Sequence, residues 1–180
     1  MTMRIALLRG VNVGGSKKVA MADLKAMLEA LGFTQVKTLL QSGNVVFEAG
    51  DRSDEALEAL LEREAEARLG LVTRFIVRGP KAWRAMIDAN PMPDEAAREP
   101  SRFLVNVARE PVTPDMIAMI RDAATPGEKI EAGDRCVYAV FGDGIAASKA
   151  SLVFGRKALG LTSTGRNWNT VMKIAALIGA

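Results

Sequence analysis

Apolar positions along residues 1–79 follow two spacings, one typical of strands and one typical of helices. Met21, Leu24 and Leu28 stand at helical spacing, as do Leu57 and Leu61 further on. Short apolar runs separate these segments and favour strands, in the order strand, helix, strand, strand, helix, strand. The predicted strands are residues 4–9, 35–40, 45–48 and 72–77, and the predicted helices are residues 20–31 and 53–69.

The same order restarts near residue 103. Between the two patterns lie a predicted helix over residues 80–89 and a stretch broken by Pro91, Pro93 and Pro100. Thr113 followed by Pro114 predicts the start of a helix, and Asn167 predicts the cap of a last helix running to residue 178. The second half is expected to have strands at residues 103–107, 129–131, 136–141 and 161–164, with a further helix over 146–158.

This pattern predicts an α+β protein with two tandem ferredoxin-like (βαββαβ) halves, an inter-half helix and a C-terminal helix. The first half is expected over residues 1–79, a helical and proline-rich connector over 80–101, and the second half with its appended helix over 102–180. The repeat is one of element order, because sequence identity between the halves is too low to establish duplication. The sequence does not indicate how the halves pack.

The chain of 180 residues contains no histidine. This excludes Ser-His-Asp and Cys-His nucleophilic centres, histidine-ligated zinc and imidazole acid–base catalysis. An enzyme would have to use carboxylates, lysines, Tyr138, Cys136 or a metal held by oxygen ligands. Cys136 is the single cysteine, so no intrachain disulfide forms. Without a signal-like or bilayer-length apolar segment, we expect a cytoplasmic protein that does not enter a membrane.

The charges are unevenly distributed, although the net charge is only +3. Residues 1–22 contain four cationic side chains and no acidic one, and residues 144–180 contain five and again no acidic one. Acidic residues concentrate between the two ends, above all over residues 51–66. Both ends therefore favour an anionic partner, with ordinary surface charge as the alternative.

A glycine-rich loop follows the first predicted strand and contains Arg9, Asn12 and Lys17. Glycines allow tight turns and expose backbone N–H groups, and a following helix start suits an anion. The loop is not a Walker A motif, because Ser16-Lys17 reverses the required order. A binding loop is the interpretation that we favour, and a plain glycine-rich turn with solvated lysines is the alternative.

The turn between the second and third strands contains Ser42, Gly43 and Asn44. Alone it would be an ordinary β-turn. In a split βαβ sheet, however, this turn and the Arg9–Lys17 loop lie at the same end of the sheet. We therefore expect Arg9, Asn12, Lys17, Ser42 and Asn44 to converge on one pocket.

A third polar cluster lies near the C-terminal end of the chain. Arg166 and Asn167 precede a predicted helix on which Lys173 follows, an arrangement that also suits an anion. Arg166 pairing with a carboxylate such as Asp143 is the structural alternative. For Trp168 we favour packing over stacking on a ligand.

The three polar segments closely resemble the signatures of DUF1697, a bacterial family of unknown function. The segments are LLRGVNVGG at residues 7–15, QSGNVVF at 41–47 and TGRNWNTV at 164–171. The resemblance spans nearly the whole chain. It implies a cytosolic bacterial α+β protein with ferredoxin-like halves, and it implies no reaction, substrate, cofactor or catalytic residue.

The function that these features favour is a binding module for a small anionic or nucleotide-like ligand. A single-stranded nucleic-acid binder is less favoured, because aromatic residues are scarce and the first and third strands contain Phe47 alone. An enzyme with a histidine-free site and a dimeric interaction protein also stay open. The sequence indicates neither a cofactor nor an oligomeric state.

Overall fold

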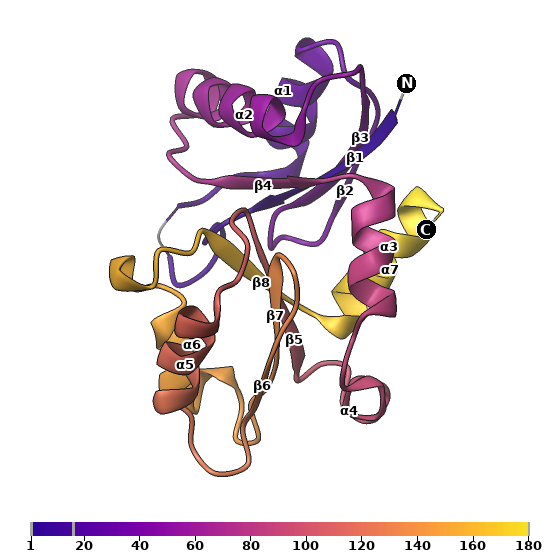
Figure 1. Ribbon diagram of the computed structural model, residues 1–180. Coiled ribbons are helices and arrows are strands. Elements are labelled where there is room, and N and C mark those ends of the chain that lie inside the picture. Colours follow the sequence, from indigo (N-terminus) through magenta and orange to yellow (C-terminus); the bar gives the residue numbers. More distant parts are fainter. Residues whose placement is uncertain (1, 16, 180) are drawn as a thin grey trace. The chain divides into compact units, whose positions relative to one another are not determined.

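The computed structural model describes residues 2–15 and 17–179, and it confirms a mixed α+β protein. The chain divides into two compact units (Figure 1). The first comprises the described residues within 1–84 and 174–180, and the second comprises residues 85–173. Together the described residues form two four-stranded antiparallel sheets and seven α-helices. No described helix combines the length and the apolar character needed to cross a bilayer.

The first unit contains a sheet with strand order β2-β3-β1-β4, in which every neighbouring pair is antiparallel. Helices α1 and α2 lie on one face of this sheet, and α3 follows β4 (Figure 1). The elements are β1 (Thr2–Leu8), α1 (Met21–Ala30), β2 (Thr34–Leu39), β3 (Asn44–Ala49), α2 (Asp54–Leu69) and β4 (Phe75–Arg78), and α3 (Pro80–Asp88) begins in this unit and ends in the second.

Helix α2 has clear sequence signals at both ends. The Ser53 hydroxyl accepts a hydrogen bond from the Ala56 N–H at 3.2 Å, and Gly70 ends the helix with φ at +61°. The helix turns Leu57 and Leu61 toward the sheet, where both are fully buried. This apolar stripe fixes the position of the opposite, charged side of α2.

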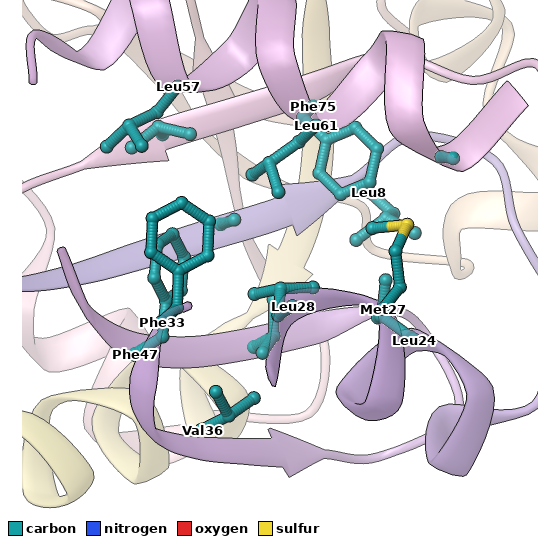
Figure 2. Packing of buried hydrophobic residues seen from close by; sticks show 14 of the residues in the cluster. Leu8, Leu24, Met27, Leu28, Phe33, Val36, Phe47, Leu57, Leu61 and Phe75 are labelled. Carbon is teal, nitrogen blue, oxygen red and sulfur yellow. The ribbon is translucent and has the colours of Figure 1, made fainter. Parts of the chain in front are cut away.

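The core of the first unit lies between the two helices and the sheet. Figure 2 shows Leu24 and Leu28 of α1 in the same cluster as Leu61 of α2 and Phe75 of β4. At one side of this cluster the rings of Phe33 and Phe47 pack with centroids 4.8 Å apart. Phe47 therefore belongs to the hydrophobic core.

The second unit contains a sheet with strand order β6-β7-β5-β8, again antiparallel throughout. Helices α5 and α6 pack with Val137 and Ala139 of β7 in one buried cluster. The elements are α4 (Pro93–Arg98), β5 (Phe103–Ala108), α5 (Pro114–Asp122), β6 (Lys129–Ala132), β7 (Cys136–Val140), α6 (Lys149–Val153), β8 (Ser163–Asn167) and the 3-10 turns Ile145–Ala147 and Lys157–Leu159. Helix α7 (Trp168–Ile178) begins in this unit, and its residues from Ile174 onward belong to the first.

Two predicted helix starts are confirmed. The Thr113 hydroxyl accepts a hydrogen bond from the Met116 N–H at 3.3 Å, with Pro114 at the first helical position. The Asn167 side-chain oxygen accepts from the N–H and the hydroxyl of Thr170, each at 3.0 Å. Both caps are short polar side chains that satisfy otherwise unbonded N–H groups.

Several element bounds differ from the sequence-based prediction. The helix expected over 146–158 is only α6, because the Ser148 hydroxyl caps a start at Lys149 and the helix stops before Gly155. The strand expected over 161–164 is β8, which pairs with β5 over Ser163–Asn167. The proline-rich connector contains the unpredicted α4, with Pro93 in the first turn, where a missing N–H costs no hydrogen bond.

Candidate functional site

The loop between β1 and α1 is held at its base by backbone hydrogen bonds. The Arg9 N–H donates to the Arg74 carbonyl at 3.0 Å, and the Thr73 hydroxyl donates to the Arg9 carbonyl at 2.7 Å. Further along, the Asn12 N–H donates to the Lys17 carbonyl at 2.8 Å. Arg9 and Lys17 are therefore carried on a loop whose two ends are fixed.

Asn12 joins this loop to the neighbouring hairpin. Its side-chain NH₂ donates to the Val19 carbonyl at 2.9 Å and to the Gln41 carbonyl at 2.7 Å. Its side-chain oxygen accepts from the Val19 N–H at 3.0 Å. The backbone of Asn12 has φ at +55°, a conformation that asparagine tolerates better than most residues. The side chain is thus fully used in holding the loop closed.

The hairpin turn meets the loop at the same end of the sheet. The Leu8 N–H donates to the Gly43 carbonyl at 2.8 Å. The buried Asn44 donates through its NH₂ to the Leu39 carbonyl at 2.7 Å and to the Ser42 hydroxyl at 3.0 Å. The two polar loops converge as the strand directions require, and Ser42 and Asn44 use these bonds to shape the turn.

Two open cavities flank the loop. The first, which we call the basic cavity, has a volume of about 560 Å³, and the second has a volume of about 720 Å³. Four cations and two carboxylates line the basic cavity, namely Arg9, Lys17, Arg63, Arg74, Glu62 and Glu66. Polar groups of the second cavity include Asn12, Lys18, Asp23, Gln41 and Arg68. Arg9 and Lys17 therefore share one cavity, while Asn12 lines the other.

Most charges of the basic cavity already have partners. Glu62 accepts from the Arg74 guanidinium at 2.8 Å and, with its other oxygen, from the Phe75 N–H at 3.0 Å. Arg63 donates to Glu64 at 3.2 Å. Hydrogen bonds from Arg68 and Arg63 hold the pKa of Glu64 below its ordinary value, so this carboxylate stays charged beside the guanidinium.

Two residues of opposite charge that line the basic cavity do not take part in these pairs. The Lys17 ammonium and the Glu66 carboxylate are both exposed, and within residues 2–15 and 17–179 neither has an ion-pair partner. The cavity consequently has one cation and one anion available to a ligand, beside side chains whose positions are fixed by internal bonds.

The second cavity lies at the start of α1. Ala20 occupies the N-cap position and has no side chain that can bond the first N–H groups of the helix. Arg68 is engaged with Glu64 at 2.8 Å. This cavity has fewer cations than the basic cavity and includes Asp23, so it is the less favourable place for an anion.

The third predicted cluster lies mainly on β8 and α7. The guanidinium of the buried Arg166 donates to the Thr164 hydroxyl and to the Gly165 carbonyl, both at 2.8 Å. Burial lowers the pKa of Arg166 to about 10. Asn167 serves as the cap of α7, and Lys173 is exposed on that helix. These three residues belong to the second unit, whereas the basic cavity belongs to the first.

Trp168 and two carboxylates of the second unit have structural contacts. Trp168 packs edge-on against Phe103 with ring centroids 5.4 Å apart, as favoured from the sequence. Glu95 accepts a hydrogen bond from Lys129, and Glu128 accepts one from the Thr125 N–H at 2.7 Å. In the part of the chain that the structure describes, no group of three or more cysteine or carboxylate side chains is placed to hold a metal ion.

The wall of the basic cavity that α2 and the segment just before β4 provide was not predicted from the sequence. Glu62, Arg63 and Glu66 lie on the charged side of α2, and the helical spacing alone does not distinguish a solvated side from a cavity wall. Strand pairing would have located Arg74, because β4 runs antiparallel to β1 and Phe75 pairs with Leu8. Arg74 must then lie beside Arg9.

Comparisons with known proteins give a family and a fold. Residues 1–138 match the model of a family described as "Protein of unknown function (DUF1697)". The fold is similar to the solved structure of the conserved bacterial protein SP0830 from Streptococcus pneumoniae, with a TM-score of 0.77 and 22% sequence identity over 98% of each chain. No functionally curated protein matches the chain.

Proposed function

The chain belongs to the DUF1697 family of proteins of unknown function, and from that premise we propose that it is a binding module for a small anionic or nucleotide-like ligand. The site of the proposal is the basic cavity. The observation that carries it is the gathering of Arg9, Lys17, Arg63 and Arg74 around one cavity beside a glycine-rich loop. No reaction is part of the proposal.

Charge and preorganisation both support anion binding there. The lining has four cations against two carboxylates, and one of those carboxylates, Glu62, is already neutralised by Arg74. The backbone of Arg9 is fixed on both sides by bonds to Arg74 and Thr73. A loop whose backbone is already fixed loses less conformational entropy when its side chains bind an anion. The volume of about 560 Å³ lies within the range of small-molecule sites.

The proposal assigns different roles to the residues singled out in the sequence. Arg9 and Lys17 contact the ligand, while Asn12, Ser42 and Asn44 hold the two loops in shape through their internal hydrogen bonds. Arg166, Asn167 and Lys173 are left out because they lie in the second unit. The described residues add no support for the alternatives of a single-stranded nucleic-acid binder, a histidine-free enzyme or a dimeric interaction protein. Phe47, the aromatic residue considered for stacking on a nucleic acid, is buried.

We also infer that each unit is a ferredoxin-like half, joined by the connector over residues 80–101, in a cytoplasmic bacterial protein. The strand orders β2-β3-β1-β4 and β6-β7-β5-β8 support the two halves. The similarity to a structure from Streptococcus pneumoniae supports the bacterial origin.

The test is a thermal-shift and calorimetric screen of phosphate, pyrophosphate and nucleotides against the full chain. A ligand at ten times its Kd should stabilise the protein by about 1.4 kcal/mol. The double variant Arg9→Gln/Lys17→Gln should lose this stabilisation, and Lys37→Gln, which changes an exposed lysine of β2, should keep it. No stabilisation by any anion, or equal stabilisation of the double variant, would sink the proposal.

A further inference from the structure

The basic cavity has an acceptor as well as cations. Glu66 lies one helical turn after Glu62 on α2, and both line the same cavity as Lys17. Glu62 is committed to Arg74 and to the Phe75 N–H, whereas the Glu66 carboxylate has no ion-pair partner in the described part of the chain. A ligand in this cavity therefore meets one available cation and one available carboxylate.

A cavity with both an available cation and an available carboxylate discriminates between classes of anion. An ionised carboxylate only accepts hydrogen bonds, so Glu66 repels the charge of a bare phosphate and can bond it only through a proton that the phosphate itself still carries. A hydroxyl or ammonium group on the same ligand would donate to Glu66 and turn that repulsion into an attraction. The chemistry that complements the whole lining is thus an anionic group at one end and a hydrogen-bond donor at the other.

We propose that the ligand is a phosphate monoester that also carries a hydroxyl or ammonium donor, an inference that rests on the proposed function. Its phosphate lies toward Arg9 and Lys17, and its donor is accepted by Glu66. The cavity of about 560 Å³ accommodates a molecule of that size. The available acceptor thereby sets selectivity against inorganic phosphate and pyrophosphate.

The experiment compares three probes: inorganic phosphate, glycerol 3-phosphate as the hydroxyl monoester and phosphoethanolamine as the ammonium monoester. Binding to the full chain is followed by NMR through the amide signals of Gly10 and Thr73, which line the cavity. The variants are Glu66→Gln, which keeps an acceptor without charge, and Glu66→Ala, which removes it. Glu29→Gln on α1 is the control, because Glu29 is exposed and does not line the basic cavity.

At least one monoester should bind about tenfold more tightly than phosphate, as expected for one hydrogen bond to a charged group. Glu66→Ala should remove that advantage, while phosphate should bind equally well or better. In Glu66→Gln, a hydroxyl monoester should still bind more tightly than phosphate, because the amide oxygen accepts its hydrogen bond. An ammonium monoester should lose its higher affinity, because the negative charge is gone. This variant therefore identifies the donor group. Glu29→Gln should bind all three probes as the wild type does.

Two results would overturn the inference while leaving the proposed function intact. One is phosphate binding as tightly as both monoesters. The other is an equal effect of the Glu66 variants on all three probes. No binding of any of the three probes, or binding that Arg9→Gln/Lys17→Gln leaves unaffected, would instead overturn the proposed function and the inference with it.

Discussion

Gly43 occupies a position where a side chain has no room. A Cβ added there would lie 2.7 Å from Val11 Cγ2 and 2.8 Å from Leu8 Cβ, and the backbone has φ at +80°. The turn must come this close because the Gly43 carbonyl accepts from the Leu8 N–H. The glycine is thus required by the contact between the hairpin and the first strand.

We predict that Gly43→Ala destabilises the protein by about 3 kcal/mol, from overpacking together with backbone strain. Gly14→Ala is the matched control: φ is +60° there and nothing lies within 4 Å of an added Cβ. The control should cost only about 1 kcal/mol of strain. Urea unfolding of both variants measures the difference, and equal losses would show that the close contact is unimportant.

Asn12 has the strongest set of internal bonds in the loop. Asn12→Asp keeps the size and the tolerance of a positive φ, but it replaces two N–H donors with an acceptor that faces the Val19 and Gln41 carbonyls. The expected loss is about 2 kcal/mol in unfolding free energy. Amide exchange at Val19 should also become faster. Unchanged stability together with unchanged exchange would contradict a structural role for Asn12.

Glu95 is expected to titrate below its ordinary range. The hydrogen bond from Lys129 is the main cause of its lowered pKa. A carboxyl whose pKa is lower in the folded state contributes stability above its unfolded pKa, and this contribution is lost as the pH falls through the folded pKa. Lys129→Met should therefore return the pKa of Glu95 toward 4.5, measured by NMR of the carboxyl carbon. An unchanged titration curve would rule out the pair as the cause.

Individual residues differ in how far the sequence predicts their roles. Asn167 was predicted as a cap from its place before an apolar helix, and the cap is present. Asn12 and Asn44 were expected to contact a ligand, yet their amides bond backbone carbonyls of their own loops. A polar side chain in a loop has the same sequence pattern in either role, because only the geometry decides which partner it reaches.

At the scale of elements, side chains from helices satisfy the outer strands of both sheets. Glu58 and Glu62 of α2 accept from the Val77 and Phe75 N–H groups of the edge strand β4, at 2.8 and 3.0 Å. In the second unit, Arg121 of α5 donates to the Ile130 carbonyl of the edge strand β6 at 2.7 Å. Occupied edge groups are one way in which proteins avoid pairing between sheet edges.

Glu58 offers a test of this protection, because it is buried and accepts from a buried amide. Glu58→Leu should leave the Val77 N–H without its carboxylate acceptor and cost about 2 kcal/mol. Glu58→Gln retains an acceptor and should cost less. Faster amide exchange at Val77 in the leucine variant alone is the expected signature. Slower exchange in that variant, or equal losses in both, would contradict the account.

Elements were predictable where their signals are local. Helix α2 has a serine cap, an apolar stripe and a terminal glycine, and it appears where these signals place it. Helix α6 is shorter than its apolar pattern implied, because the Ser148 cap and Gly155 act against the continuous spacing. The contribution of α2 to the basic cavity was not predictable from its charges, because solvated and cavity-lining charges share one pattern.

At the scale of the whole molecule, the two units repeat one arrangement. Arg78 on β4 and Arg166 on β8 pair in register with Ile5 and Val105, and each donates to the carbonyl of the preceding residue, at 2.6 and 2.8 Å. The units nevertheless differ at the ends of their first strands. The glycine-rich loop and the basic cavity belong to the first unit, where the proposed function is located.

A titration of the full chain with inorganic phosphate and with glycerol 3-phosphate, followed by amide NMR, tests that location most directly. We predict saturable shifts of the amide signals of Gly10, Lys17, Glu66 and Thr73, abolished in Arg9→Gln/Lys17→Gln and retained in Lys37→Gln. Shifts that are absent, that survive in the double variant, or that gather instead around Arg166 in the second unit would contradict it.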